Sequence, residues 1–361
     1  MTLQGLVKSY EHLIVTRIFL GMTEAGFFPA ATFLVTTWYC RWQLQTRMAI
    51  FYSAASLAGS FSGILAFGIQ HMDGIGGLGG WRWIFILEGI ITVAVGCLVP
   101  WTLPNTPDDA TFLTPEEKMF IKLQLQRDQG LSGEGTADAK DGFDWGALKD
   151  ALMDWKIYLA VVMYWGNCIA TYGFNFSAPT IIHQLGYSAA DAQLLTVPPY
   201  FLGSCSTLLF AYLSDKYRRR WVFIVIPFSI ALVGYTAMLA IPHPQLPGLT
   251  YFFIFWITAG LYASIIGTVS WVGNNLAPAF KRAVGMAVLM TVGNLGGTVG
   301  SNIFLAEQEP NYWLGYGLSH GIIVAAITCT VVLRFMTQHI NRKRDQVSED
   351  EVRARYSEGM L

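Results

Sequence analysis

Two charged residues lie within the first long apolar segment of the chain, where a charge is costly and usually functional. Arg17 and Glu24 are seven positions apart, or two helical turns, so a helix would present both on one face. The planar guanidinium of Arg17 can bond both oxygens of a carboxylate. A partly desolvated Glu24 can carry a proton. The pair therefore predicts binding of an anion and a proton, and the alternative is a structural ion pair that stiffens the helices.

The later apolar segments are interpreted as offering amides and aromatic rings rather than a further acid or base. Amides at membrane depth either bond to a neighbouring helix or line a cavity, so both roles stay open for each of them. Glu88, beside Gly89 in the third apolar segment, is interpreted as structural. The candidates for substrate contact in the later segments are Asn167, Tyr172, Asn175, Trp271 and Asn274.

Motifs for other chemistry are not found in the sequence. The five cysteines are scattered without metal-ligand spacing, so they are interpreted as packing residues. There is no glycine-rich phosphate loop, no nucleophile elbow and no His/Cys cluster. We therefore expect no cofactor, no metal and no enzymatic activity. A net charge of −1, without a basic patch interleaved with aromatics, argues against a nucleic-acid partner.

The elements that carry these residues are predicted to be membrane-spanning helices. Hydrophobic residues make up 53% of the chain and charged residues 13%, with a mean hydropathy of +0.42. Soluble domains have about a quarter charged residues, so a lipid bilayer is the expected solvent. The sequence predicts an all-α polytopic membrane protein with about nine spans, three before a long loop and six after it. The spans are 13–37, 48–70, 81–103, 157–182, 193–213, 221–241, 250–272, 283–305 and 317–338.

Lysine and arginine occur in alternate connections between these spans. Such residues concentrate on the cytoplasmic side, so the long loop, the Lys216–Arg220 connection and the C-terminus are predicted to be cytoplasmic, and the N-terminus outside. The connections without Lys or Arg are 71–80, 183–192, 242–249 and 306–316. The predicted domains are a partial N-terminal half (1–103), a central cytoplasmic loop with amphipathic helices (104–156), a six-helix C-terminal half (157–340) and a cytoplasmic tail (341–361).

The long loop carries its own helix signals. Thr114, Pro115 and Glu117 predict a helix start with a capping box. Residues 130–142 are interpreted as a flexible polar linker. Asp144 is expected to cap a short interfacial helix. Its apolar stripe consists of Trp145, Leu148, Leu152 and Trp155.

Glycines four positions apart occur in two of the predicted spans, each of which follows an arginine. Such spacing lets helices approach closely in lipid. The two spans therefore form a weak internal repeat, in keeping with a transporter built from two parallel repeats. The glycines are Gly59 and Gly63 in span 48–70, and Gly293, Gly296, Gly297 and Gly300 in span 283–305.

Two stretches carry a resemblance to a known family. Residues Leu213–Arg220 resemble the cytoplasmic loop signature G-x-L-x-D-R-x-G-R-R of the major facilitator superfamily, with Ala211 and Arg218 in place of its two glycines. Residues Arg17–Pro29 look like the fourth helix of the anion:cation symporter branch of that superfamily. Residues 47–89 are similar to the fungal allantoate, nicotinate and pantothenate permeases.

The resemblance implies two repeats that enclose a central site opening to each side in turn. It implies proton-coupled uptake of a small organic anion, such as a vitamin or nitrogen-source carboxylate, by a monomer in the plasma membrane. Arg17 would contact the anion and Glu24 would take part in proton coupling. At the cytoplasmic face the closed states would be braced by Asp215, Lys216, Arg219 and Arg220.

Such transporters have twelve helices, and this chain is expected to begin just before the fourth. One alternative is therefore a truncated, inactive transporter fragment. Another is a non-transporting nutrient sensor with the same fold, which a long signalling tail would favour. A membrane enzyme would need a catalytic constellation at a membrane face, and the sequence offers none.

Overall fold

The structure is a computed structural model that describes residues 1–70, 72–129, 145–243, 245–276 and 279–345. Over these residues it is helical, without a β-strand, which confirms the all-α class. Short 3₁₀ turns occur at Thr2–Leu6 (η1), Ile75–Gly77 (η2) and Ala306–Gln308 (η3). The helices are α1 (Tyr10–Glu24), α2 (Phe27–Trp38), α3 (Arg41–Gln70), α4 (Gly80–Thr102), α5 (Pro115–Gln129), α6 (Trp145–Leu152), α7 (Trp155–Gln184), α8 (Ala189–Leu195), α9 (Val197–Tyr217), α10 (Val222–Ala240), α11 (Pro247–Asn275), α12 (Ala279–Gly300) and α13 (Trp313–Asp345).

Seven helical segments in the described part of the chain are long and apolar enough to cross a membrane. They coincide with the third to ninth predicted spans, and α8 and α9 together form one of them. The count of nine is not confirmed. The two other predicted spans correspond to α1 with α2, and to α3, which contains residues 48–70 within its 30 residues.

The first predicted span, 13–37, is not one continuous helix. The helix α1 ends at Glu24 and α2 begins at Phe27, with Ala25 and Gly26 in the turn between them. Pro29 has no backbone N–H, so the carbonyl of Ala25 has no donor four residues later. The break therefore follows from the position of the proline, which the apolar pattern alone does not reveal.

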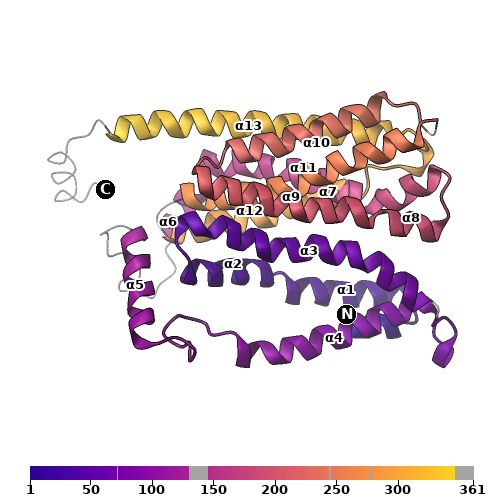
Figure 1. Ribbon diagram of the computed structural model, residues 1–361, viewed down its shortest axis with the longest axis horizontal. Coiled ribbons are helices and arrows are strands. Elements are labelled where there is room, and N and C mark those ends of the chain that lie inside the picture. The colour runs from indigo at the N-terminus through magenta and orange to yellow at the C-terminus, as the bar shows by residue number, and fades with distance from the viewer. Residues whose placement is uncertain (71, 130–144, 244, 277–278, 346–361) are drawn as a thin grey trace.

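The described helices form two layers, and α3 joins them (Figure 1). One layer contains α1–α4, and the other contains α7 and α9–α13. The helix α3 packs against α9 and α11 on one side and against α2 and α4 on the other. Buried apolar residues of α3, α7, α11 and α12 form a common core, with Met48 and Ala49 of α3 fully buried in it. In contrast, α1 has no buried residue.

The glycines of α12 bring it close to α7, as their spacing predicts. A Cβ atom added at Gly300 would lie 2.5 Å from the carbonyl oxygen of Ile169, and one at Gly293 would overlap the ring of Tyr164. Gly59 in α3 has nothing within 4 Å of such an atom. The close approach is therefore confirmed for α12 and is not found at Gly59.

We call the end of the bundle where residues 216–220 join α9 to α10 the basic end; α5 and α6 lie there too (Figure 1). The capping box of α5 is confirmed, because Glu117 accepts a hydrogen bond from the Thr114 N–H at 2.9 Å. This backbone bond, followed by one from the Thr114 hydroxyl, lowers the pKa of Glu117. The predicted linker 130–142 and the predicted cap Asp144 lie outside the described residues. That α6 lies on the inner leaflet stays a prediction.

Candidate functional site

Tyrosines and an amide gather where α3 faces α7 and α11. The side-chain amide of Asn175 donates a hydrogen bond to the Tyr262 hydroxyl at 3.2 Å. The Tyr262 ring meets that of Tyr200 edge to face, with the centroids 6.0 Å apart. Tyr52 of α3 lies within electrostatic range of the hydroxyls of Tyr262 and Tyr172. We call these five residues the central cluster.

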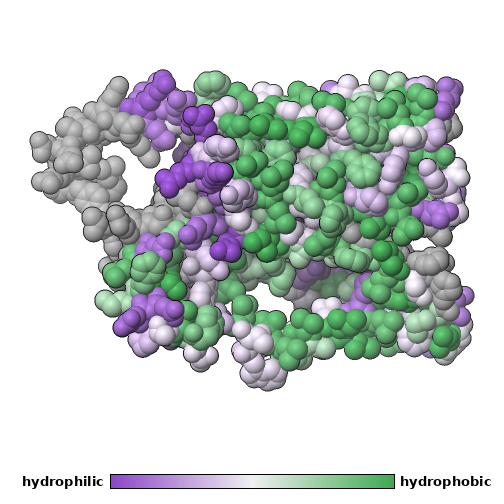
Figure 2. Space-filling view, in the orientation of Figure 1, coloured by the Kyte–Doolittle hydropathy of each residue, from purple (hydrophilic) through white to green (hydrophobic). Residues whose placement is uncertain are grey.

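The space-filling view shows an opening between the two layers, with hydrophilic residues inside it (Figure 2). Tyr172 of the central cluster is 42% exposed. Tyr172 and Asn175, both predicted for substrate contact, are therefore brought together, three residues apart on α7. Tyr52 and Tyr200 were not among the predicted site residues. Tyrosines are common at the ends and interfaces of membrane helices, so their type alone does not mark them.

The predicted pair, Arg17 and Glu24, does not form an ion pair; the salt bridges of the described residues do not include one between them. Glu24 lies at the end of α1, within electrostatic range of the Tyr172 hydroxyl on α7. The Arg17 guanidinium lies 5.7 Å from the ring centroid of Phe85 on α4. Both charged residues are exposed. The structure therefore gives no support to the alternative of a rigidifying ion pair.

Asn167 serves as a link between two helices. Its side chain is buried and donates to the carbonyl oxygen of Leu261 at 2.5 Å and to the Ser264 hydroxyl at 2.9 Å, both on α11. These bonds use both donors of the amide nitrogen. Of the two roles open to Asn167, the geometry favours packing between α7 and α11, and its contact with a substrate stays a prediction.

Trp271 and Asn274 lie at the basic end, apart from the central cluster. Nine residues separate Tyr262 from Trp271 along α11, which corresponds to about 14 Å of helix. The structure therefore divides the predicted substrate residues into two groups. With its amide oxygen turned toward Arg220, Asn274 accepts hydrogen bonds from both terminal guanidinium nitrogens, at 3.0 and 3.2 Å.

A polar latch joins the two layers at the basic end. One carboxylate oxygen of Asp215 accepts from the Thr46 N–H at 2.8 Å and from the Thr46 hydroxyl at 2.6 Å. The other lies 3.9 Å from the Arg220 guanidinium. Beside it, the Ser214 hydroxyl donates to the Gln45 side-chain oxygen at 3.0 Å. The latch therefore ties the first turns of α3 to the end of α9 across 169 positions of sequence.

The other predicted gating residues take different places. Lys216 is exposed, and its ammonium lies 5.9 Å from the ring centroid of Tyr212 on the same helix. Arg219 is also exposed, whereas Arg220 is 5% exposed. The structure thus brings Asp215 and Arg220 together. The two partners of the latch on α3 are Thr46, which bonds to Asp215, and Gln45, which bonds to Ser214. Both were missed because nothing in their local sequence marks them.

A second charged contact at the basic end joins α7 to α12. Asp154 caps α7 and lies 2.7 Å from the Lys281 ammonium. Burial tends to raise the pKa of Asp154, but the hydrogen bonds from Lys281 and the Lys156 N–H, with the two lysine charges, lower it overall. The carboxylate is therefore ionised at neutral pH and holds the starts of the two helices together.

The sequence of the chain is similar to known protein families and to individual proteins, and these similarities identify its fold. The family model described as Major Facilitator Superfamily matches residues 1–301. The chain belongs to the major facilitator superfamily. The MFS-type transporter cnsO of Penicillium expansum is 33% identical over 366 residues, which cover 99% of this chain and 70% of that protein. The high-affinity nicotinic acid transporter of Saccharomyces cerevisiae is 30% identical over 341 residues, which cover 94% and 62%.

Solved structures agree with this fold. The proton:xylose symporter XylE matches with a TM-score of 0.59 at 16% identity, covering 83% of this chain and 65% of that one. A bacterial homologue of the lysosomal transporter Spinster matches with a TM-score of 0.52 at 18% identity, covering 92% and 78%. This major facilitator chain spans about two thirds of the length of the curated relatives above.

These findings confirm the predicted family and the resemblance to fungal permeases. The relatives are named as transporters, so this major facilitator protein is a transporter of small molecules and not an enzyme. Its seven apolar helices make it an integral, multi-pass membrane protein.

Proposed function

We propose that this protein is a secondary active transporter that takes up a small organic anion, such as a vitamin or nitrogen-source carboxylate, together with a proton. The observation that carries the proposal is the position of Glu24. Its carboxyl group ends α1 in one layer and lies within electrostatic range of Tyr172 in the other. A proton bound to Glu24 removes the charge that acts on Tyr172, so proton binding can bias the relative position of the two layers.

The organic anion is supported by Arg17 and by one relative. A guanidinium within the membrane is suited to a carboxylate because its fork bonds both oxygens. The nicotinic acid transporter of Saccharomyces cerevisiae is a relative whose name gives an organic acid as its substrate. Arg17 lies one layer away from the cluster amide of Asn175, so an anion between the layers would meet a charge on one side and a neutral amide on the other.

In this proposal the polar latch closes the basic end of the bundle. Asp215 and Arg220, with Lys216 and Arg219 beside them, brace the basic end when the layers are close and release it when they part. The basic end, including the C-terminus, faces the cytoplasm in this proposal, and the protein works as a monomer in the plasma membrane.

The test is uptake of labelled nicotinate, and of a panel of other monocarboxylates, by cells expressing the protein under an imposed pH gradient. Glu24→Gln mimics the protonated carboxyl, so accumulation driven by the gradient should be lost while exchange of substrate persists. Glu88→Gln, which removes the same charge from a half-buried glutamate of α4, is the control and should accumulate normally. Normal pH-dependent accumulation by Glu24→Gln would end the coupling proposal.

The role of Arg17 is tested separately. Arg17→Lys should raise the substrate concentration needed for half-maximal uptake at an unchanged protein level, because an ammonium lacks the planar fork. A purely structural role predicts a lower folded yield instead, partly restored in the double variant Arg17→Ala, Glu24→Ala. Recovery of yield in that double variant would count against anion binding by Arg17.

A further inference from the structure

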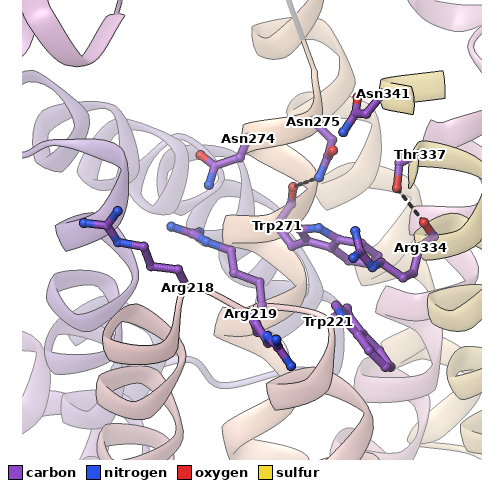
Figure 3. Close-up of a pocket in the computed structure, with 10 residues that line it drawn as sticks. Arg218, Arg219, Trp221, Trp271, Asn274, Asn275, Arg334, Thr337 and Asn341 are labelled. Atoms are coloured by element: carbon purple, nitrogen blue, oxygen red, sulfur yellow. Dashed lines mark hydrogen bonds between the residues drawn. The ribbon is translucent and has the colours of Figure 1, made fainter. Parts of the chain in front are cut away.

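A cavity of about 580 Å³ opens at the basic end, between the α9–α10 connection, the end of α11 and the last turns of α13 (Figure 3). Its volume falls within the range of small-molecule sites. Two tryptophans, Trp221 and Trp271, contribute apolar wall. The cavity lies about 14 Å along α11 from the central cluster, so a ligand here would not occupy the proposed transport site.

Among the described residues, the charged side chains that line this cavity are all arginines. Arg218, Arg219 and Arg220 come from the α9–α10 connection, and Arg334 comes from α13. Asp215, which belongs to the polar latch, lies 3.9 Å from Arg220. Arg220 contacts Asp215 and, with the amide oxygen of Asn274 turned toward it, Asn274 as well. Arg219 on one wall and Arg334 on the other place further positive charge at the cavity.

A neutral amide and a helix end also lie at this cavity. Asn341 contributes the amide, whereas the Thr337 hydroxyl already donates to the backbone carbonyls of Leu333 and Arg334. Arg334, Thr337 and Asn341 are spaced by three and four positions, so α13 presents all three to the cavity. Across from them, Trp221 is the N-cap residue of α10 and makes no side-chain capping bond. The partial positive charge of a helix N-terminus therefore lies at the same cavity.

The sequence pattern did not single out Arg334. It falls inside the predicted span 317–338, where the later spans were interpreted as lacking a base, and it is partly buried. The sequence does contain a sign of this site, because Arg334, Thr337 and Asn341 follow an i, i+3, i+7 spacing that places three polar side chains on one face of a helix. That interpretation was therefore wrong at Arg334.

We propose that this cavity binds a phosphate-bearing anion, either the phosphomonoester headgroup of an anionic membrane lipid or a soluble phosphate monoester of similar size. Two guanidinium groups on opposite walls suit a doubly charged phosphate better than a single carboxylate, because each fork can bond two of its oxygens. A lipid source is available if the basic end faces the cytoplasm, whose leaflet is anionic. The proposal does not rest on the transport function, since it concerns binding alone.

The test compares two probes that share one headgroup. Purified protein is titrated with phosphatidic acid in mixed detergent micelles and with glycerol 3-phosphate, which lacks the acyl chains, and binding is followed by native mass spectrometry. Arg334→Gln and Arg219→Gln should each weaken binding about tenfold, the effect of losing one charge-assisted hydrogen bond. Arg342→Gln removes the same charge two turns further along α13, at an exposed residue that does not line the cavity, and should bind as the unmodified protein does.

The outcomes separate the two sources. Binding of phosphatidic acid alone supports a lipid site, and competition by glycerol 3-phosphate supports a site for soluble phosphates. Arg334→Lys keeps the charge and should retain more affinity than Arg334→Gln, which guards against a loss caused by misfolding. Equal loss in Arg342→Gln and Arg334→Gln, or no binding of either probe, would overturn the proposal.

Discussion

The polar latch at the basic end makes a quantitative prediction for Asp215→Asn. The carboxylate of Asp215 accepts two hydrogen bonds from Thr46 on one oxygen and faces Arg220 with the other. Its side chain is 11% exposed, and that of Arg220 is 4% exposed. Asparagine has nearly the same shape, so it removes the charge and one acceptor while leaving the packing unchanged.

The size of the effect follows from these contacts. A hydrogen bond to a charged group contributes about 2 kcal/mol and one to a neutral group about 1 kcal/mol. Both Thr46 donors bond to the same oxygen, and the amide oxygen of asparagine can accept from both, so each bond is weakened by about 1 kcal/mol. The attraction of Arg220 at 3.9 Å adds about 1 kcal/mol, because the pair is only partly shielded from water. The first turns of α3 should therefore lose about 3 kcal/mol of local stability, which is about a hundredfold in the opening equilibrium.

Hydrogen–deuterium exchange of the α3 amides in the purified protein measures this opening directly. Asp215→Asn should speed exchange around Thr46 about a hundredfold, and Thr46→Val, which removes only the hydroxyl bond, about tenfold. Asp191→Asn changes a carboxylate of α8 that accepts from Ser188, at the other end of the molecule, and should leave exchange around Thr46 unchanged. Unchanged exchange at Thr46 in Asp215→Asn would show that the latch does not hold α3.

Three further predictions concern the rest of the structure. The lowered pKa of Asp154 means that its contact stabilises the fold above the unfolded pKa and is lost as the pH falls through the folded one. The melting temperature of the unmodified protein should therefore fall more steeply than that of Asp154→Asn between about pH 5 and about pH 2; parallel curves would refute this. Gly300→Leu should destabilise the α7–α12 crossing by about 1–3 kcal/mol in chemical unfolding. Gly317→Leu, at a glycine with open space around it, is its control and should have little effect. Finally, cysteines placed at Lys149 and Gln245 in a background without the native cysteines should react with an impermeant reagent from opposite sides of the membrane, and labelling from one side would contradict the topology.

Features that depend on neighbours in the sequence were predicted well. Runs of apolar residues identified the seven membrane helices, because crossing lipid requires about 20 such residues whatever the helix packs against. The α5 capping box was predicted because its partners, Thr114 and Glu117, are three residues apart. The α12 glycines were interpreted correctly because a missing side chain permits close approach wherever a partner helix is present.

The candidate site could be predicted only in part, because its members come from helices far apart in the chain. The sequence by itself singled out the charges of Arg17 and Glu24 and the amides of Asn167 and Asn175 within predicted spans. Only the tertiary structure decided that Glu24 lies within electrostatic range of Tyr172 while Arg17 lies over Phe85, and that Asn167 bonds to α11. It also decided that Asp215 meets Thr46, 169 positions away, and that Arg334 joins the arginines of another connection. The local sequence pattern gives the hydrophobicity and the residue spacing along one helix. These contacts depend instead on which faces of two helices pack against each other, and the packing of the whole bundle decides which faces those are.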